Sequence, residues 1–206
     1  MMKRLLALLV AVAALITVAV PADARERREQ PSQDFQVDDS PSFANFFANF
    51  GAGGTTGSGP IPRTVVGFHS NYEPGTIVIS TAERRLYLVT GPDQALRYGI
   101  GVGRDGFRWG GVHRITAKKE WPSWTPPAQM LARRPDLPRF MPGGIDNPLG
   151  ARAMYLGSTL YRIHGSNEPE TIGQAVSSGC FRMTNDDVKD LYDRVRVGAK
   201  VVVKNN

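Results

Sequence analysis

Runs of apolar residues with few interruptions indicate that most of the chain after residue 63 forms β-strands. Residues 76–80 and 86–90 are rich in β-branched and aromatic side chains and flank a short polar segment, a pattern typical of a hairpin. Comparable runs predict five further strands, at 95–101, 112–118, 151–156, 159–164 and 200–204. The pattern therefore predicts a sheet-dominated domain over residues 63–206.

Two segments have helical character. A short helix is expected near 127–134, and a long loop rich in Pro and Gly follows it over 135–150. A second helix is expected to begin at Thr184, which forms a capping-box pattern with Asp187. Its apolar residues recur at helical spacing on one face: Val188, Leu191, Tyr192 and Val195. The predicted fold is mixed α/β, mostly β, with short helices in a single domain.

The first residues have the pattern of a secretory signal. Lys3 and Arg4 precede an apolar run over 5–20, and the small residues Ala22 and Ala24 provide a cleavage pattern. The alternative is an uncleaved anchor, but sixteen helical residues span roughly 24 Å, less than the ~30 Å hydrocarbon core of a bilayer. We therefore expect residues 1–24 to be a signal peptide and the protein to be exported to the periplasm or cell envelope.

The segment that follows has the composition of a linker. It is charged near its start and rich in Gly, Ser and Thr over 51–60, which favours flexible coil. Four phenylalanines fall within 43–50, a tract too short to indicate a specific role. The sequence thus predicts a flexible linker over 25–62.

Charge and cysteine content narrow the function classes. The chain has 25 Lys and Arg against 19 Asp and Glu, a net charge of +6 that favours an anionic partner. Nucleic acid is disfavoured, because the basic residues are dispersed and no nucleic-acid motif is present. One cysteine excludes an internal disulfide and zinc sites of the Cys-pair type. His69 and His113 lack partners at metal-ligand spacing, so no metal is expected.

The candidate chemistry centres on Cys180, which lies 16 positions after His164. A thiolate is a nucleophile, and a nearby imidazole is able to take the proton of the thiol. Gly179 permits a tight turn in which the N–H groups of Ser178, Gly179 and Cys180 face an oxyanion. This interpretation predicts thiol acyl transfer with a depressed thiol pKa. The alternative is an inert, buried cysteine.

The motifs around these two residues resemble those of the L,D-transpeptidase catalytic domain of bacterial cell-wall enzymes. The similarity includes His164-Gly165-Ser166, Ile172-Gly173 and Ser177-x-Gly179-Cys180-x-Arg182. Upstream segments are also similar, at 74–79, 121–127 and 147–153, so the resemblance covers about residues 72–203. Part of the family has a His where this chain has Ser178 and an Asn where it has Arg182. These departures affect which branch of the family the chain resembles and which group accepts the acyl chain, but not the identity of the expected nucleophile.

The resemblance implies an L,D-transpeptidase-like β-sandwich and a reaction. Cys180 would attack a peptidoglycan stem peptide and form a thioester, while His164 acts as proton acceptor and donor with its ring oriented by the Gly165 carbonyl. Arg182 shares a strand face with Cys180 and would bind a stem carboxylate. Arg162 shares a face with His164 in the same way and would also meet anionic substrate. No metal or organic cofactor is implied.

The acceptor remains open at this stage. A second stem peptide would give a 3→3 cross-link, a lipoprotein lysine would give protein attachment, and water would make the protein an L,D-carboxypeptidase or endopeptidase. A cell-wall-binding module is the non-catalytic alternative. Carbapenem-type β-lactams are expected to acylate Cys180, because their carbonyl mimics that of the acyl donor.

Overall fold

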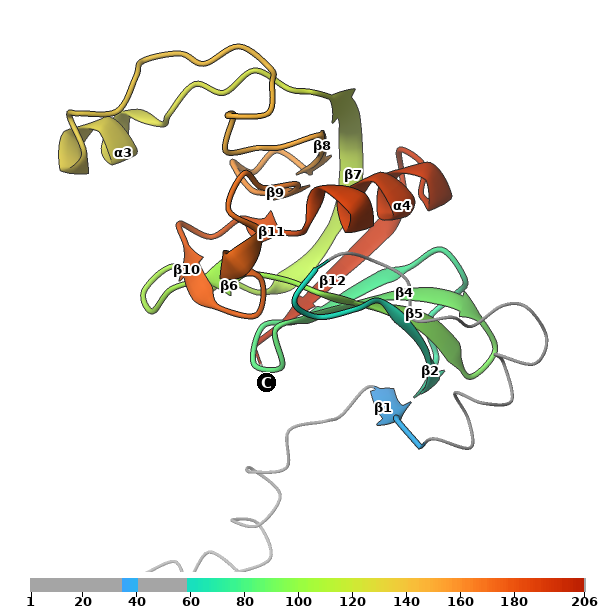
Figure 1. The fold of residues 1–206 in the computed structure, drawn as a ribbon. Helices are drawn as coiled ribbons and strands as arrows, with labels where there is room; N and C mark the ends of the chain where they lie inside the picture. Colours follow the sequence, from blue (N-terminus) through green and yellow to red (C-terminus); the bar gives the residue numbers. More distant parts are fainter. Residues whose placement is uncertain (1–34, 41–58, 206) are drawn as a thin grey trace, which may run out of the picture. The chain divides into compact units, whose positions relative to one another are not determined.

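The computed structural model describes residues 35–40 and 59–205. The predicted signal peptide at 1–24 and the phenylalanine tract at 43–50 lie outside these residues. The described part contains a ten-stranded sheet in the order β1-β2-β5-β4-β3-β12-β7-β8-β9-β11 (Figure 1). The predicted mixed, mostly-β fold with few helices is confirmed. No helix among the described residues has the length and apolar character needed to cross a membrane.

The strands of the large sheet, in chain order, are β1 (Phe35–Asp38), β2 (Thr64–Ser70), β3 (Ile77–Ser80), β4 (Arg85–Gly91), β5 (Gln94–Gly99), β7 (Gly111–Glu120), β8 (Arg152–Leu156), β9 (Arg162–His164), β11 (Phe181–Arg182) and β12 (Lys200–Lys204). A separate parallel pair consists of β6 (Val102–Gly103) and β10 (Ala175–Ser177). The helices are α3 (Ala128–Arg133), the 3-10 turn η1 (Pro169–Thr171) and α4 (Asn185–Arg194).

The long strand β7 connects two parts of the sheet. Its first residues pair with β12, and its remaining residues pair with β8 (Figure 1). Buried side chains of β3, β4, β5 and β12 form one core cluster with those of β8, β9, β11 and α4. The core therefore lies between the two parts of the sheet and α4, and it supports β9 and β11.

The predicted strand at 159–164 is shorter than expected, because residues 157–161 form a turn. The hydroxyl of Thr159 donates to the carbonyl of Leu156 at 2.6 Å and accepts from the backbone N–H of Tyr161 at 3.1 Å. A threonine that bonds to nearby backbone in this way competes with extended pairing. Only Arg162–His164 remain in β9.

A strand was missed within the predicted linker over 25–62. Residues 35–38 form β1, which pairs antiparallel with β2, so this part of the segment differs from the flexible coil expected. The ring of Phe35 stacks on that of Phe68, with centroids 4.8 Å apart. Phe35 and Val37 thereby cover a second apolar cluster on the other face of the sheet.

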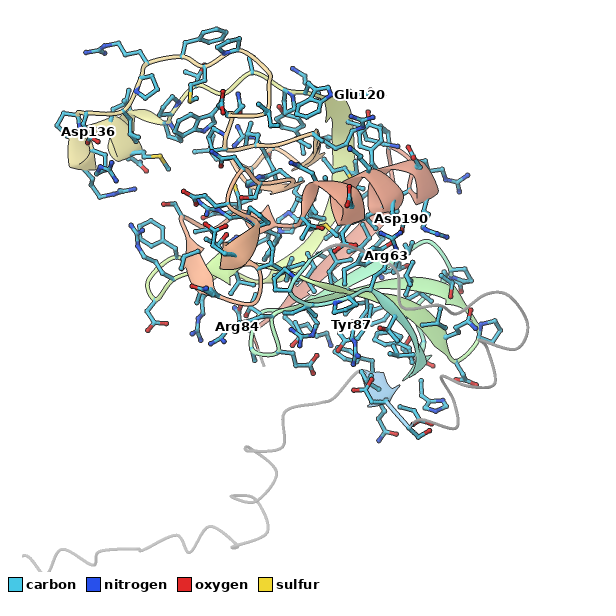
Figure 2. The ribbon with its side chains drawn as sticks, in the orientation of Figure 1. Arg63, Arg84, Tyr87, Glu120, Asp136 and Asp190 are labelled. Carbon is cyan, nitrogen blue, oxygen red and sulfur yellow. The ribbon has the colours of Figure 1, made fainter. Side chains whose placement is uncertain are left out.

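The helix α4 is capped as the sequence predicts. The Thr184 side chain accepts a hydrogen bond from the Asp187 backbone N–H at 3.2 Å. Arg63, which precedes β2, forms ion pairs with Asp187 at 3.0 Å and Asp190 at 3.8 Å. Figure 2 shows Arg63 next to Asp190 on α4. These contacts fix the helix against the strands.

The C-terminal end of α4 is held by a lysine from β7. Nζ of Lys118 donates to the carbonyls of Tyr192 at 2.6 Å and Val195 at 2.7 Å. The last carbonyls of a helix have no partner within the helix and carry partial negative charge. The ammonium satisfies two of them.

We expect Lys118→Met to lower the free energy of unfolding by about 1–3 kcal/mol, because two partly buried carbonyls lose a charged donor. Urea denaturation of both proteins measures the difference. Lys119→Met is the matched control, because Lys119 is the exposed neighbour on the same strand and should change stability by less than about 0.5 kcal/mol. Equal effects of the two substitutions would contradict this role for Lys118.

Candidate active site

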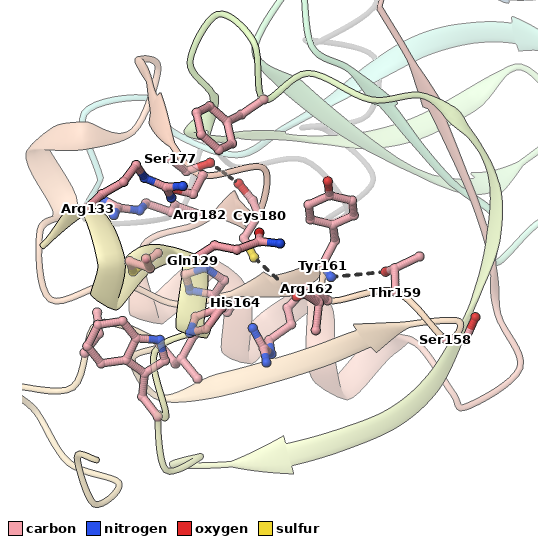
Figure 3. A pocket seen from close by; sticks show the side chains of 18 residues that line it. Gln129, Arg133, Ser158, Thr159, Tyr161, Arg162, His164, Ser177, Cys180 and Arg182 are labelled. Carbon is pink, nitrogen blue, oxygen red and sulfur yellow. Dashed lines mark hydrogen bonds between the residues drawn. The ribbon is translucent and has the colours of Figure 1, made fainter. Parts of the chain in front are cut away.

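A cavity of about 460 Å³ lies where β9, the β10–β11 connection and α3 meet (Figure 3). Its lining contains both residues singled out as nucleophile and base, Cys180 and His164. It also contains Arg162, Arg182 and Ser178. The expectation that the thiol and the imidazole meet in one pocket is therefore confirmed.

The pairing of two short strands brings these side chains together. β9 and β11 are parallel, with Phe181 opposite Ile163 and Arg182 opposite His164. Ile163 and Phe181 are both buried in the core. Because side chains alternate along a strand, the residues on either side of each point the other way, into the cavity.

The imidazole of His164 is oriented by the neighbouring carbonyl, as the sequence suggested. His164 is 4% exposed, and its Nδ1 lies 2.6 Å from the carbonyl oxygen of Gly165. A carbonyl only accepts hydrogen bonds, so Nδ1 carries the proton. Burial, together with the charges of Arg182 and Arg162, lowers the pKa of His164 to about 3, against the opposing effect of the Gly165 hydrogen bond. The ring is neutral at pH 7, with an unprotonated Nε2 that is able to accept a proton.

The sulfur of Cys180 lies over the start of β9. Its Sγ is 3.9 Å from the carbonyl oxygen of Leu160. Burial raises the pKa of the Cys180 thiol, while the charge and hydrogen bonds of Arg162 and the charge of Arg182 oppose this effect. The depressed pKa expected from the sequence is therefore wrong for the ligand-free chain. The resting pair is a neutral thiol beside a neutral imidazole.

The turn before Cys180 is built on a glycine. Gly179 has a φ of +105°, and a Cβ there would lie 2.5 Å from a ring carbon of Tyr161. The indole N–H of Trp109 donates to the Gly179 carbonyl at 2.7 Å. The Ser177 hydroxyl donates to the Cys180 carbonyl at 2.6 Å and accepts from the Gly179 N–H at 3.2 Å. Only glycine fits this turn.

The hydrogen bond from the Gly179 N–H to the Ser177 hydroxyl affects the predicted oxyanion site. The Gly179 N–H donates to Ser177 in the ligand-free chain, so it faces an oxyanion only after leaving that hydroxyl. Ser178 lines the cavity.

Arg182 also meets a partner that the sequence did not reveal. A guanidinium nitrogen of Arg182 donates to a carboxylate oxygen of Glu168 at 2.8 Å. Arg182 lines the cavity as predicted, but one of its nitrogens already binds an internal carboxylate. A guanidinium has five N–H donors, so this pair uses part of its capacity.

Sequence reasoning missed much of the wall contributed by α3. The α3 residues Gln129, Met130 and Arg133 line the cavity, and the guanidinium of Arg133 lies 5.3 Å from the ring centroid of Phe107. The Pro-rich segment before α3 and the helix prediction itself were the available signals. Trp124, which belongs to that segment, also lines the cavity.

The other histidines lie away from this cavity. His69 pairs with Asp93 at 2.9 Å, and the ring of His113 packs edge-on against Trp109. No group of three or more His, Cys, Asp or Glu side chains is arranged to hold a metal ion within residues 35–40 and 59–205.

Comparison with known proteins shows which family the chain belongs to. Residues 74–203 match the family model of the YkuD L,D-transpeptidase catalytic domain. The chain belongs to this family. It is 40% identical over 136 residues to "Probable L,D-transpeptidase ErfK/SrfK" of Escherichia coli (strain K12), and 41% identical over 134 residues to "Probable L,D-transpeptidase YbiS" of the same organism. These matches cover 62% and 61% of this chain and 43% of each relative.

Solved structures share the fold of this L,D-transpeptidase domain. L,D-transpeptidase 3 from Mycobacterium tuberculosis, in complex with a faropenem-derived adduct, has a TM-score of 0.51 and 14% identity. The match covers 69% of this chain and 68% of that structure. At this identity the similarity concerns the fold.

We expect alkylation of Cys180 by iodoacetamide to accelerate with rising pH up to and beyond 9, with no inflection near pH 6–7. The thiol pKa is raised and the imidazole is neutral, so no imidazolium–thiolate pair contributes at neutral pH. Intact-mass measurement of alkylation rates between pH 5 and 10 tests this. A rate plateau reached below pH 7 would show a preformed ion pair instead.

Proposed function

We propose that this chain is an exported L,D-transpeptidase that forms 3→3 cross-links in peptidoglycan through a thioester on Cys180. The observation that carries the proposal is the shared cavity of Cys180 and His164, with the His164 tautomer set by Gly165. Membership of the L,D-transpeptidase catalytic domain family supports the reaction class.

In the first half-reaction, Nε2 of His164 takes the proton of the Cys180 thiol. The sulfur attacks the carbonyl carbon of the L-centre of diaminopimelate in a tetrapeptide stem. The C–N bond to the terminal D-Ala breaks, and the proton on Nε2 passes to the departing amine. The products are free D-Ala and a thioester on Cys180.

In the second half-reaction, an amine of another stem diaminopimelate attacks the thioester carbonyl. Nε2 of His164 accepts the proton of the attacking amine, the C–S bond breaks, and the sulfur recovers the proton. A lipoprotein lysine in place of the stem amine gives protein attachment, and water gives a tripeptide. The acceptor that reaches the cavity decides among these outcomes.

The oxygen of the attacked carbonyl becomes negative and needs donors. Backbone N–H groups of the Ser178–Cys180 turn are the proposed donors, with the Gly179 N–H exchanging the Ser177 hydroxyl for the oxyanion. Arg182 is the proposed contact for a stem carboxylate, which would share or replace Glu168 as its partner.

Export to the periplasm or cell envelope is part of the proposal. The charged, apolar and small-residue pattern of 1–24 supports it.

We expect the purified protein to convert tetrapeptide-bearing muropeptides into cross-linked dimers. Cys180→Ala and His164→Gln should lower turnover by about 10³-fold or more, because one removes the nucleophile and the other the base. His69→Gln is the matched control and should retain full activity, because His69 lies outside the cavity. Mass analysis of the products measures the turnover of the wild type and the three variants.

The product identifies the reaction. Dimers support the transpeptidase, tripeptide without dimers indicates an L,D-carboxypeptidase, and unchanged muropeptide indicates a wall-binding module. Full turnover by Cys180→Ala would refute the thioester.

We expect a carbapenem to acylate Cys180. The carbonyl carbon of its strained amide is an electrophile of the same kind as the amide carbonyl carbon of the stem peptide. A faropenem-derived adduct is described for a protein of this fold. Intact-mass spectrometry should show a gain of one carbapenem in the wild type and none in Cys180→Ala. An adduct of equal yield on both proteins would place the reaction elsewhere.

A further inference from the structure

We propose that Arg162 is an additional catalytic residue, which stabilises the thiolate of Cys180 through its backbone N–H and its guanidinium when the thiol gives up its proton. Its importance for turnover rests on the function proposed above. Its effect on the thiol does not, and it is measurable without any cell-wall substrate.

Strand register places Arg162 beside the sulfur. Phe181 is opposite Ile163 in the parallel pair of β9 and β11, so the preceding residues, Cys180 and Arg162, are neighbours at the cavity end of the two strands. The contact of Cys180 Sγ with the Leu160 carbonyl, two residues before Arg162, fixes the sulfur over this part of the chain. Figure 3 shows the sulfur with the Arg162 and His164 side chains beneath it in the view.

The guanidinium of Arg162 is held in place, but it lacks hydrogen-bond acceptors for part of its donors. Its carbon lies 5.2 Å from the ring centroid of Tyr155, a stacking contact that limits its movement. Its Nε is buried and meets no hydrogen-bond partner in the described part of the chain. No carboxylate of the described residues forms a salt bridge with it. A thiolate at Cys180 would supply the missing negative charge.

The other charged groups around the sulfur are less suited to this role. Arg182 is paired with Glu168 at 2.8 Å, so part of its charge is already compensated. Arg133 belongs to α3 and lies against the Phe107 ring. His164 is buried and neutral, because desolvation disfavours its imidazolium. Arg162 is therefore the cation that the β9–β11 register places beside the sulfur and that forms no salt bridge within the described residues.

Electrostatics support the same assignment. Arg162 opposes the burial that raises the pKa of the Cys180 thiol, through its charge and through hydrogen bonds from its backbone and side chain. It also lowers the pKa of His164. The arginine thus favours a thiolate with a neutral imidazole. The proton of the thiol passes to Nε2 of His164 and from there to the departing amine, or to solvent in an alkylation experiment, so the imidazole returns to its neutral form. The electron pair stays on sulfur until it attacks, and the Arg162 N–H groups donate to it.

The test is the pH dependence of Cys180 alkylation by iodoacetamide in four proteins: wild type, Arg162→Gln, Arg162→Lys and Arg196→Gln. Arg162→Gln should move the curve to higher pH. Below the thiol pKa, the rate should fall about tenfold for each pH unit that the curve moves. The curve of Arg162→Lys should lie between those of the wild type and Arg162→Gln, because lysine keeps the charge but lacks the planar guanidinium. The exposed Arg196 is the matched control and should leave the curve unchanged.

An Arg162→Gln curve that coincides with that of the wild type would overturn the proposal. Far-UV circular dichroism checks folding of each variant. If Arg162→Gln does not fold, the Lys variant decides: a curve at higher pH supports the proposal and coincidence with the wild type overturns it. Muropeptide turnover is measured in parallel. Absence of turnover by the wild type refutes the proposed function and leaves the alkylation result standing.

Discussion

The parallel pairing of β9 with β11 is the constraint on which the site depends. These two strands have only three and two residues, yet their register decides which side chains meet. Ile163 and Phe181 anchor them in the core, and alternation then directs His164, Arg162, Cys180 and Arg182 to the cavity. A slip of one residue would bury the charged groups and expose the apolar pair, so burial of that pair specifies the register.

Several supports far apart in sequence maintain this pairing. Trp109 binds the carbonyl of Gly179, and the Ser177 hydroxyl bridges the two ends of the same turn. On the other side, α4 packs on β8 and contributes Val188 and Leu191 to the cluster that contains Ile163. The thiol of Cys180 is thus presented on a turn with little freedom. Such rigidity would limit the entropy lost on binding of the proposed acyl donor.

The sequence was informative where chemistry or periodicity was local. The N-terminal cap of α4 and most strands follow from neighbouring residues, and the Cys180–His164 pair and the Gly165 contact follow from motifs that resemble those of the L,D-transpeptidase family. β1 was missed because four residues within polar surroundings carry little periodicity. The Glu168–Arg182 pair and the raised pKa of the Cys180 thiol depend on burial and on three-dimensional neighbours. A motif identifies the candidate nucleophile but does not determine how deeply it is buried.

The internal ion pair bears on how an anionic substrate enters. The guanidinium of Arg182 is partly buried at the cavity wall, and a partly buried charge is costly when it has no partner. Glu168 compensates it from a half-exposed position. The proposed stem carboxylate, if it took the place of Glu168, would exchange one ion pair for another and release Glu168 to water, so net charge attraction would contribute little affinity. Discrimination at this position then rests on the geometry of the guanidinium fork, because a well-placed carboxylate binds it with two parallel hydrogen bonds.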